Sequence, residues 1–156
     1  MIERLRMKLT NQLSKQQFNE VHQFLSQRSY WSKGICIDKL RTALENSLCF
    51  ALVDNGQLIA FARVVSDYAT FANLLDVFVL EPYRGMGHGK KLIDAVVTHP
   101  KLQGLRRFSL ATHDAHGLYE QFGFKCVKQP EFMMERYHQK AITFHRNTPT
   151  HRLASL

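Results

Sequence analysis

The sequence has 156 residues, of which 45% are hydrophobic and 22% charged. This length and composition predict one globular domain and exclude a disordered chain. No apolar run approaches the roughly 20 residues that span a bilayer, and the first residues lack the apolar stretch of a secretory signal. We therefore expect a cytoplasmic protein with no membrane partner.

The formal net charge is +8, which attracts polyanions of several kinds. The basic residues are scattered instead of forming one tract, so a phosphate-rich cofactor is favoured over nucleic acid as the partner. The three cysteines, Cys36, Cys49 and Cys126, are odd in number and widely spaced. They predict neither a disulfide framework nor a zinc site.

The first half of the chain predicts two helices between strands. Alternation over residues 5–9 is typical of a strand, and residues 10–14 offer a turn and a helix cap. Helical spacing of apolar residues predicts one helix up to about Ser26 and a second over 36–45. Two strands, 48–53 and 57–65, flank Asn55-Gly56, which favours a hairpin.

The second half predicts a central strand, two helices and three further strands. Residues 74–80 are almost wholly apolar, as in a strand buried on both faces. Apolar spacing predicts a helix over 88–98, ended by Pro100, and a short helix over 116–122. The remaining strands are expected at 107–111, 124–127 and 132–136.

A glycine-rich stretch, Arg84-Gly85-Met86-Gly87-His88-Gly89, joins the central strand to the next helix. Glycines there let backbone N–H groups converge on one point at a helix N-terminus, which favours a bound phosphate. The Walker pattern fails because Arg84 replaces its first glycine and Lys91 its hydroxyl residue. The dinucleotide pattern G-x-G-x-x-G fails as well.

The pattern that fits is R-x-x-G-x-G, carried by Arg84, Gly87 and Gly89. It resembles the pyrophosphate signature of the GNAT superfamily of N-acetyltransferases. A second motif, Ala115-His116-Gly117-Leu118-Tyr119-Glu120-Gln121-Phe122-Gly123-Phe124, resembles the A-x-x-L-Y-x-x-x-G-F of that family. The resemblance covers about residues 5–136.

This resemblance implies an α/β fold: a mixed, twisted sheet of about seven strands, splayed in the middle, with helices on both faces. The domain would occupy residues 1–137. The C-terminal tail, residues 138–156, receives no function.

The resemblance also implies a binding site for acetyl-coenzyme A and no metal. The pyrophosphate would bind the backbone amides of seven residues: Arg84, Gly85, Met86, Gly87, His88, Gly89 and Lys90. The pantetheine arm would pair with the backbone of Val77, Phe78 and Val79 as an added strand. Thr112 stands where many relatives carry an asparagine that binds the pantetheine.

Two residues are candidate catalytic groups. Tyr119 matches the general acid of the family, which protonates the departing thiolate. Asp76 is the one carboxylate within the apolar central strand, and a base is needed because an ammonium has no lone pair. Asp76 could instead be paired with Arg63, and some relatives use ordered water and a carbonyl at a β-bulge.

Tyr30 and Trp31 lie in a loop that ends in a glycine, and with Arg63 they are candidate substrate-binding residues. An equal interpretation is that the two aromatics anchor the loop on the core. His113 and His116 are spaced as an H-x-x-H pair, but they lack a third ligand at a sensible spacing, so we expect no metal there.

The sequence thus predicts direct transfer of an acetyl group from acetyl-coenzyme A to a primary amine, of a small molecule or of a peptide or protein, within a ternary complex. The alternative is a sensor that keeps the fold and binds coenzyme A without turnover. The amine is not specified, and a homodimer is a reasonable expectation.

Overall fold

The structure is a computed structural model and describes residues 7–144 of the chain. Its strands are β1 (Met7–Thr10), β2 (Leu48–Asp54), β3 (Gln57–Ser66), β4 (Phe71–Val79) and β5 (Arg107–Leu110). Its α-helices are α1 (Lys15–Gln27), α2 (Ile37–Glu45), α3 (His88–Val97) and α4 (His116–Glu120). Four 3-10 turns complete the described elements: η2 (Glu81–Tyr83), η3 (Pro100–Leu102), η4 (Pro130–Phe132) and η5 (Gln139–Thr143). None of the helices in these residues has both the length and the apolar character needed to cross a bilayer.

The five strands form one mixed sheet in the order β1-β2-β3-β4-β5. The pairs β1–β2, β2–β3 and β3–β4 are antiparallel, and β5 runs parallel to β4. The turn between β2 and β3 has Asn55 at φ 51° and Gly56 at φ 80°. Two successive positive φ values are what a tight two-residue hairpin requires, so the predicted hairpin is confirmed.

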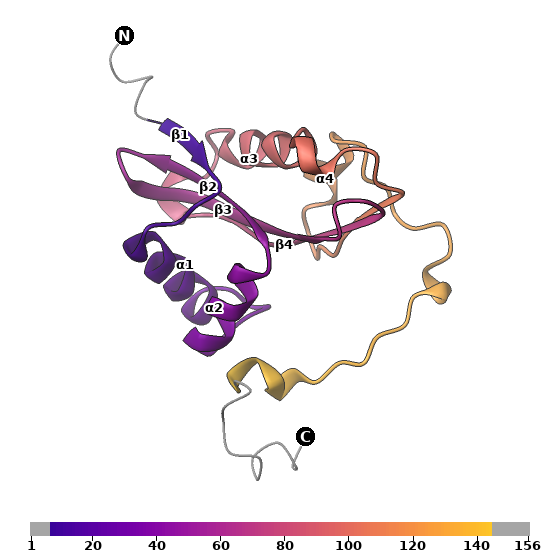
Figure 1. Cartoon of the computed structure of the whole chain (residues 1–156), viewed down its shortest axis with the longest axis horizontal. Helices are drawn as coiled ribbons and strands as arrows, with labels where there is room; N and C mark the ends of the chain where they lie inside the picture. The colour runs from indigo at the N-terminus through magenta and orange to yellow at the C-terminus, as the bar shows by residue number, and fades with distance from the viewer. Residues whose placement is uncertain (1–6, 145–156) are drawn as a thin grey trace.

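Helices cover both faces of the sheet, as predicted (Figure 1). Successive side chains of a strand point to opposite faces, and β2 is buried almost throughout. Ala51 and Val53 therefore pack with α1 and α2, while Phe50 and Leu52 pack with α3 and α4. The result is two apolar layers, one on each side of the sheet.

Strand β4 contains a bulge at Asp76. Arg63 of β3 pairs with Leu75, but Phe61 pairs with Phe78, so Asp76 and Val77 together face one residue of β3. Asp76 has φ 54°, the left-handed region that aspartate tolerates better than most residues. The extra residue reverses the alternation of side chains along the strand.

The parallel pairing of β4 and β5 is short. It runs from the pair Phe71 and Arg107 to the pair Leu74 and Leu110, whereas β4 continues to Val79. Within residues 7–144, the last part of β4 therefore has no strand beside its outer edge. This opening is the splay that the family resemblance implied.

The two closing strands predicted at 124–127 and 132–136 are wrong. These residues form no strand, and only the 3-10 turn η4 interrupts an otherwise irregular path. A strand needs a neighbouring backbone to bond with, and residues 124–136 form no ladder with β5, the strand at that edge of the sheet. The sheet therefore has five strands within residues 7–144, not about seven.

The described part of the predicted tail lies against α2 (Figure 1). The Cys36 N–H donates to the Ile142 carbonyl at 3.1 Å, and the Lys39 Nζ donates to the Ala141 carbonyl. The Ile142 side chain packs on the apolar layer of α1 and α2. Residues 138–144 are therefore attached to the side of the sheet that α1 and α2 cover.

Replacing Ile93 by alanine should lower the free energy of unfolding by about 2–5 kcal/mol, because this α3 side chain is fully buried and its loss leaves a cavity. Asp94→Ala, on the exposed side of the same helix, is the matched control and should change stability by less than about 0.5 kcal/mol. Urea denaturation measures both, and equal losses would contradict this packing.

Candidate functional site

The glycine-rich turn connects the free end of β4 to α3. The chain passes from Val79 through η2 and then through Gly85 and Gly87, at φ 76° and 82°. Gly87 is the N-cap of α3 and provides no side-chain cap. Positive φ values of this kind favour glycine. This backbone conformation explains why the motif has glycine at positions 85 and 87.

The first turn of α3 presents backbone amides that have no helical partner. The Lys91 N–H is the first to bond inside the helix, to the Gly87 carbonyl at 3.2 Å. The amides of His88, Gly89 and Lys90 therefore carry the partial positive charge of the helix N-terminus without a helical acceptor. The amide of Arg84, by contrast, bonds to the Glu81 carbonyl within η2.

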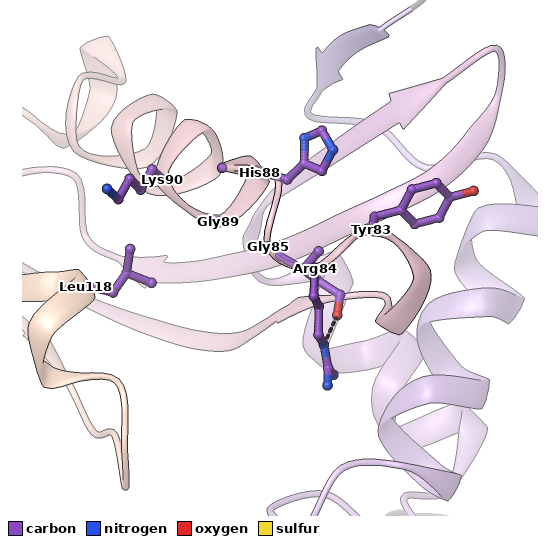
Figure 2. Close-up of a pocket in the computed structure, with 9 residues that line it drawn as sticks. Tyr83, Arg84, Gly85, His88, Gly89, Lys90 and Leu118 are labelled. Atoms are coloured by element: carbon purple, nitrogen blue, oxygen red, sulfur yellow. Dashed lines mark hydrogen bonds between the residues drawn. The ribbon is translucent and has the colours of Figure 1, made fainter.

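A cavity of about 250 Å³ lies at this turn (Figure 2). Its lining combines the glycine turn with side chains of three other segments: Val79, Tyr83, Arg84, Gly85, Gly87, His88, Gly89, Lys90 and Leu118. Tyr83 directly precedes the glycine motif and Leu118 lies inside the second motif, but neither was assigned to the site from the sequence. Met86 does not line the cavity, and its side chain is 65% exposed.

Gly89 sits where α3 comes close to β4 and α4. A methyl group on it would lie 3.8 Å from Val79 Cγ2 and 3.9 Å from Leu118 Cδ2. These are ordinary contact distances, so a side chain would fit but would occupy the cavity floor. Glycine at this position keeps the cavity open.

Backbone groups of β4 face the opening beside the cavity. The Leu80 N–H donates to the Ile59 carbonyl of β3, and directions alternate along a strand. Val79 and Val77 therefore direct their backbone groups outward, whereas those of Phe78 face β3. The Val79 carbonyl accepts a hydrogen bond from Arg84 Nε at 2.9 Å (Figure 2).

Tyr119 is buried at the end of α4, with 8% of its surface exposed. Its ring lies edge-on to Phe124, 6.0 Å between centroids. Burial raises the pKa of the Tyr119 phenol, and the nearby charges of Asp114 and Tyr30 raise it further. The phenol is therefore a proton donor and not a phenolate at neutral pH.

Asp76 lies at the centre of a polar cluster on the α1 and α2 side of the sheet. Arg63 Nε donates to Asp76 Oδ2 at 2.6 Å, and Trp31 Nε1 donates to Oδ1 at 2.9 Å. Arg63 also donates to Ser47 Oγ at 3.2 Å. The structure thus brings together three of the predicted site residues and adds Ser47.

Burial raises the pKa of the neighbouring Cys49 thiol to about 11, an effect that Arg63 reduces and Asp76 reinforces. Cys49 is therefore a thiol and not a thiolate at neutral pH.

Tyr30 connects this cluster to the α4 side of the site. Its ring lies edge-on to Trp31 at 5.0 Å and to His113 at 6.1 Å between centroids. Tyr30 is 70% exposed and Trp31 40%, so both rings present a face to solvent. The contact between His113 and Tyr30 was not predicted, because no sequence pattern connects the two residues.

Thr112 lies apart from the cavity at the glycine turn. Its Oγ1 accepts a hydrogen bond from the Ala115 N–H at 3.0 Å, just before α4 begins. The hydroxyl keeps its own proton for donation. Among the described residues no three His, Cys, Asp or Glu side chains are grouped as a metal site would need.

Comparison with known proteins agrees with this geometry. The model of the acetyltransferase (GNAT) family matches residues 11–124. A crystal structure of a putative GNAT-family acetyltransferase from Xanthomonas campestris pv. campestris superposes with a TM-score of 0.83 and is 47% identical, covering 88% of this chain and 97% of that one.

Two curated proteins are more distant. A putative acetyltransferase of Gibberella zeae is 27% identical over 122 residues, which are 64% of this chain and 68% of that protein. The ribosomal protein bS18 alanine N-acetyltransferase of Haemophilus influenzae is 33% identical over 88 residues, 53% of this chain and 58% of that enzyme. Since the family model spans most of the sequence and its glycine turn forms the cavity described above, the chain belongs to the GNAT family of acetyltransferases.

Proposed function

We propose that the protein transfers the acetyl group of acetyl-coenzyme A to a primary amine in a single ternary complex. The observation that carries this function is the glycine turn: three helix amides without helical partners converge on a cavity at the open end of β4. Family membership supports the same chemistry. The acceptor amine attacks the thioester carbonyl carbon, and the carbon–sulfur bond breaks as the amide forms.

The diphosphate of the cofactor binds at the turn. The amides of His88, Gly89 and Lys90 face its oxygens, and the helix N-terminus adds favourable partial charge. The amide of Gly85, which also lines the cavity, completes the cradle. The net charge of +8 assists the encounter with a polyanionic cofactor.

The pantetheine arm then enters the opening between β4 and β5. It bonds to the outward backbone groups of Val77 and Val79 as an added strand, and Thr112 supplies a hydroxyl near α4. Arg84 occupies the Val79 carbonyl in this structure. Its guanidinium has to release that carbonyl or share it when the arm enters.

Tyr119 acts as the general acid. Its phenol gives its proton to the coenzyme A thiolate as the carbon–sulfur bond breaks. The raised pKa of Tyr119 keeps that proton on the phenol until the thiolate forms. Coenzyme A leaves as the thiol, and the Tyr119 phenolate regains a proton from solvent before the next cycle.

Asp76 acts as the general base. An ionised carboxylate offers about four acceptor sites, and the bonds from Trp31 and Arg63 use two of them. A remaining lone pair takes the proton of the amine, directly or through one water. Arg63 and Trp31 hold the carboxylate in position while this happens.

The acceptor amine enters past Tyr30 and Trp31. The Trp31 indole is bonded to the Asp76 carboxylate and the Tyr30 ring lies edge-on to Trp31, and aromatic faces attract an ammonium before it loses its proton. Amine acceptors in proteins occur among the relatives, since the H. influenzae enzyme is named for an alanine of a ribosomal protein. A peptide N-terminus is one such acceptor for this chain.

Replacing Tyr119 by phenylalanine should lower kcat by about 100-fold, the lower end of what a general acid contributes, and leave the KM for acetyl-coenzyme A nearly unchanged. The ring keeps its contact with Phe124, so the melting temperature should stay the same. Thiol release with a panel of amines measures the rate.

Because the phenol pKa lies above its usual value near 10, Tyr119 should cause no loss of wild-type activity below about pH 10. An unchanged kcat in the variant would remove Tyr119 from the mechanism and leave a sensor as the better description.

Gly87→Ala should weaken coenzyme A binding at least tenfold, because the turn can no longer hold φ 82° without strain. Gly104→Ala is the matched control. Gly104 also has a positive φ, 72°, with open space around the position of a Cβ, and it lies outside the cavity. Both variants should lose about 1–2 kcal/mol of stability, and calorimetry with coenzyme A should separate them. Equal affinities would show that the turn does not bind the cofactor.

Asp76→Asn should lower kcat by about 100-fold or more, because an amide cannot accept the proton of the amine. Asparagine tolerates the left-handed backbone at this position, so the bulge should persist. Trp31→Phe removes the indole hydrogen bond and part of the ring but leaves the carboxylate in place, so it should cost clearly less. If the two variants lose the same activity, the role of Asp76 is to orient the rings of Tyr30 and Trp31, and another group takes the proton.

A further inference from the structure

One end of the sheet has no helix over it on the α1 and α2 side within residues 7–144. Side chains alternate along a strand, so Phe61, Arg63 and Val65 of β3 share the side on which Phe61 packs with α1. Phe61 is fully buried there, whereas Val65 is 37% exposed. The hairpin between β3 and β4 extends beyond α1 and α2 (Figure 1). These two helices therefore cover one end of β3 and leave the other open.

The uncovered surface continues across β4 and β5. Ala72 and Leu74 of β4, and Phe108 and Leu110 of β5, pack with α3 and α4. The residues between them therefore point to the uncovered side. We call this surface the open face. The strand register arranges it in three rows: Arg63 with Leu75; Val65 with Asn73 and Ser109; and Phe71 with Arg107.

The two ends of the open face carry opposite charges. Asp76 is bonded to Arg63, so the base proposed above lies at the first row. Arg107 lies at the third row, is exposed, and makes none of the ion pairs found in residues 7–144. The carboxylate of Asp67, in the adjoining loop, is bonded to Thr70 and to loop amides instead. The open face therefore suits a ligand with a cationic and an anionic end.

Between these charges the open face offers apolar and hydrogen-bonding groups. Val65 and Phe71 are 37% and 41% exposed. The Asn73 amide and the Ser109 hydroxyl are both half-buried and make no hydrogen bond to the other residues that the structure describes. A side-chain amide both donates and accepts, so Asn73 can bond to the N–H and the C=O of a peptide. This combination fits a peptide backbone that carries an apolar side chain.

We propose that the acceptor is a peptide N-terminus that lies extended across the open face and has an acidic residue at about its fourth position. This inference rests on the proposed function and specifies its substrate. Leu75 and Phe71 are about 13 Å apart along β4, a length that an extended peptide covers in about four residues. The amino group of the peptide reaches Asp76, and its fourth side chain reaches Arg107. The second side chain points the same way and packs on Val65.

Steady-state thiol release by the full chain tests this acceptor. The substrates are six-residue peptides with an amidated C-terminus, leucine at position two, and glutamate, glutamine or lysine at position four. The glutamate peptide should have a kcat/KM about fivefold above that of the glutamine peptide, the upper range for an exposed ion pair. The lysine peptide should have the lowest value, and the preference should shrink as the salt concentration rises.

Arg107→Gln should lower the kcat/KM of the glutamate peptide to that of the glutamine peptide. Arg106→Gln is the matched control, because it removes the same charge from the preceding exposed residue, whose side chain points away from the open face. This control should keep the preference for glutamate. Val65→Thr, which nearly keeps the shape of the side chain, should reduce the preference for leucine over glycine at position two by about twofold.

Equal kcat/KM values for the glutamate and glutamine peptides, or a preference that survives Arg107→Gln, would overturn this inference and leave the transfer reaction in place. Acetylation of small amines with every peptide inert would do the same. No thiol release with any amine would contradict the proposed function, and this inference with it. A light-scattering mass of two chains that falls to one in Phe71→Asp would assign the open face to a second copy and also overturn the proposal.

Discussion

One extra residue in β4 organises the site. Before the bulge, Ala72 and Leu74 pack with α3 and α4; after it, Phe78 packs with α1 and stacks on Phe24 at 4.0 Å. Without the bulge these three side chains would share one face of the sheet. The reversal lets the same strand contribute to both apolar layers and turns Val77 and Val79 toward the α3 side.

The bulge also explains the position of the carboxylate. Asp76 is buried and held in a left-handed conformation, a backbone state that persists only where the surroundings stabilise it. The ion pair with Arg63 and the bond from Trp31 supply that stabilisation. A buried charge without such partners would be costly, so the cluster serves the fold as well as the chemistry proposed for it.

Much of the fold could be predicted because it depends on local patterns. The helices follow apolar spacing, the hairpin follows Asn55-Gly56, and the cap at Ser14 bonds to the Gln17 N–H as its position indicated. The glycine turn was recognised because positive φ values demand glycine at Gly85 and Gly87. The bulge was considered only as a feature of some relatives and could not be located from the sequence, since it is set by packing between β3 and two helical layers. The prediction of strands at 124–127 and 132–136 was wrong because it used the local pattern alone. Residues 132–136 have the pattern of a strand, but they form no ladder with β5.

The position of the single tryptophan has a practical consequence. The chain contains one tryptophan, and its indole N–H donates to the Asp76 carboxylate at the centre of the polar cluster. Its emission therefore reports on that one location, without background from elsewhere in the molecule. Any compound that displaces the carboxylate, or stacks on the rings of Tyr30 and Trp31, alters the fluorescence of the unlabelled protein directly.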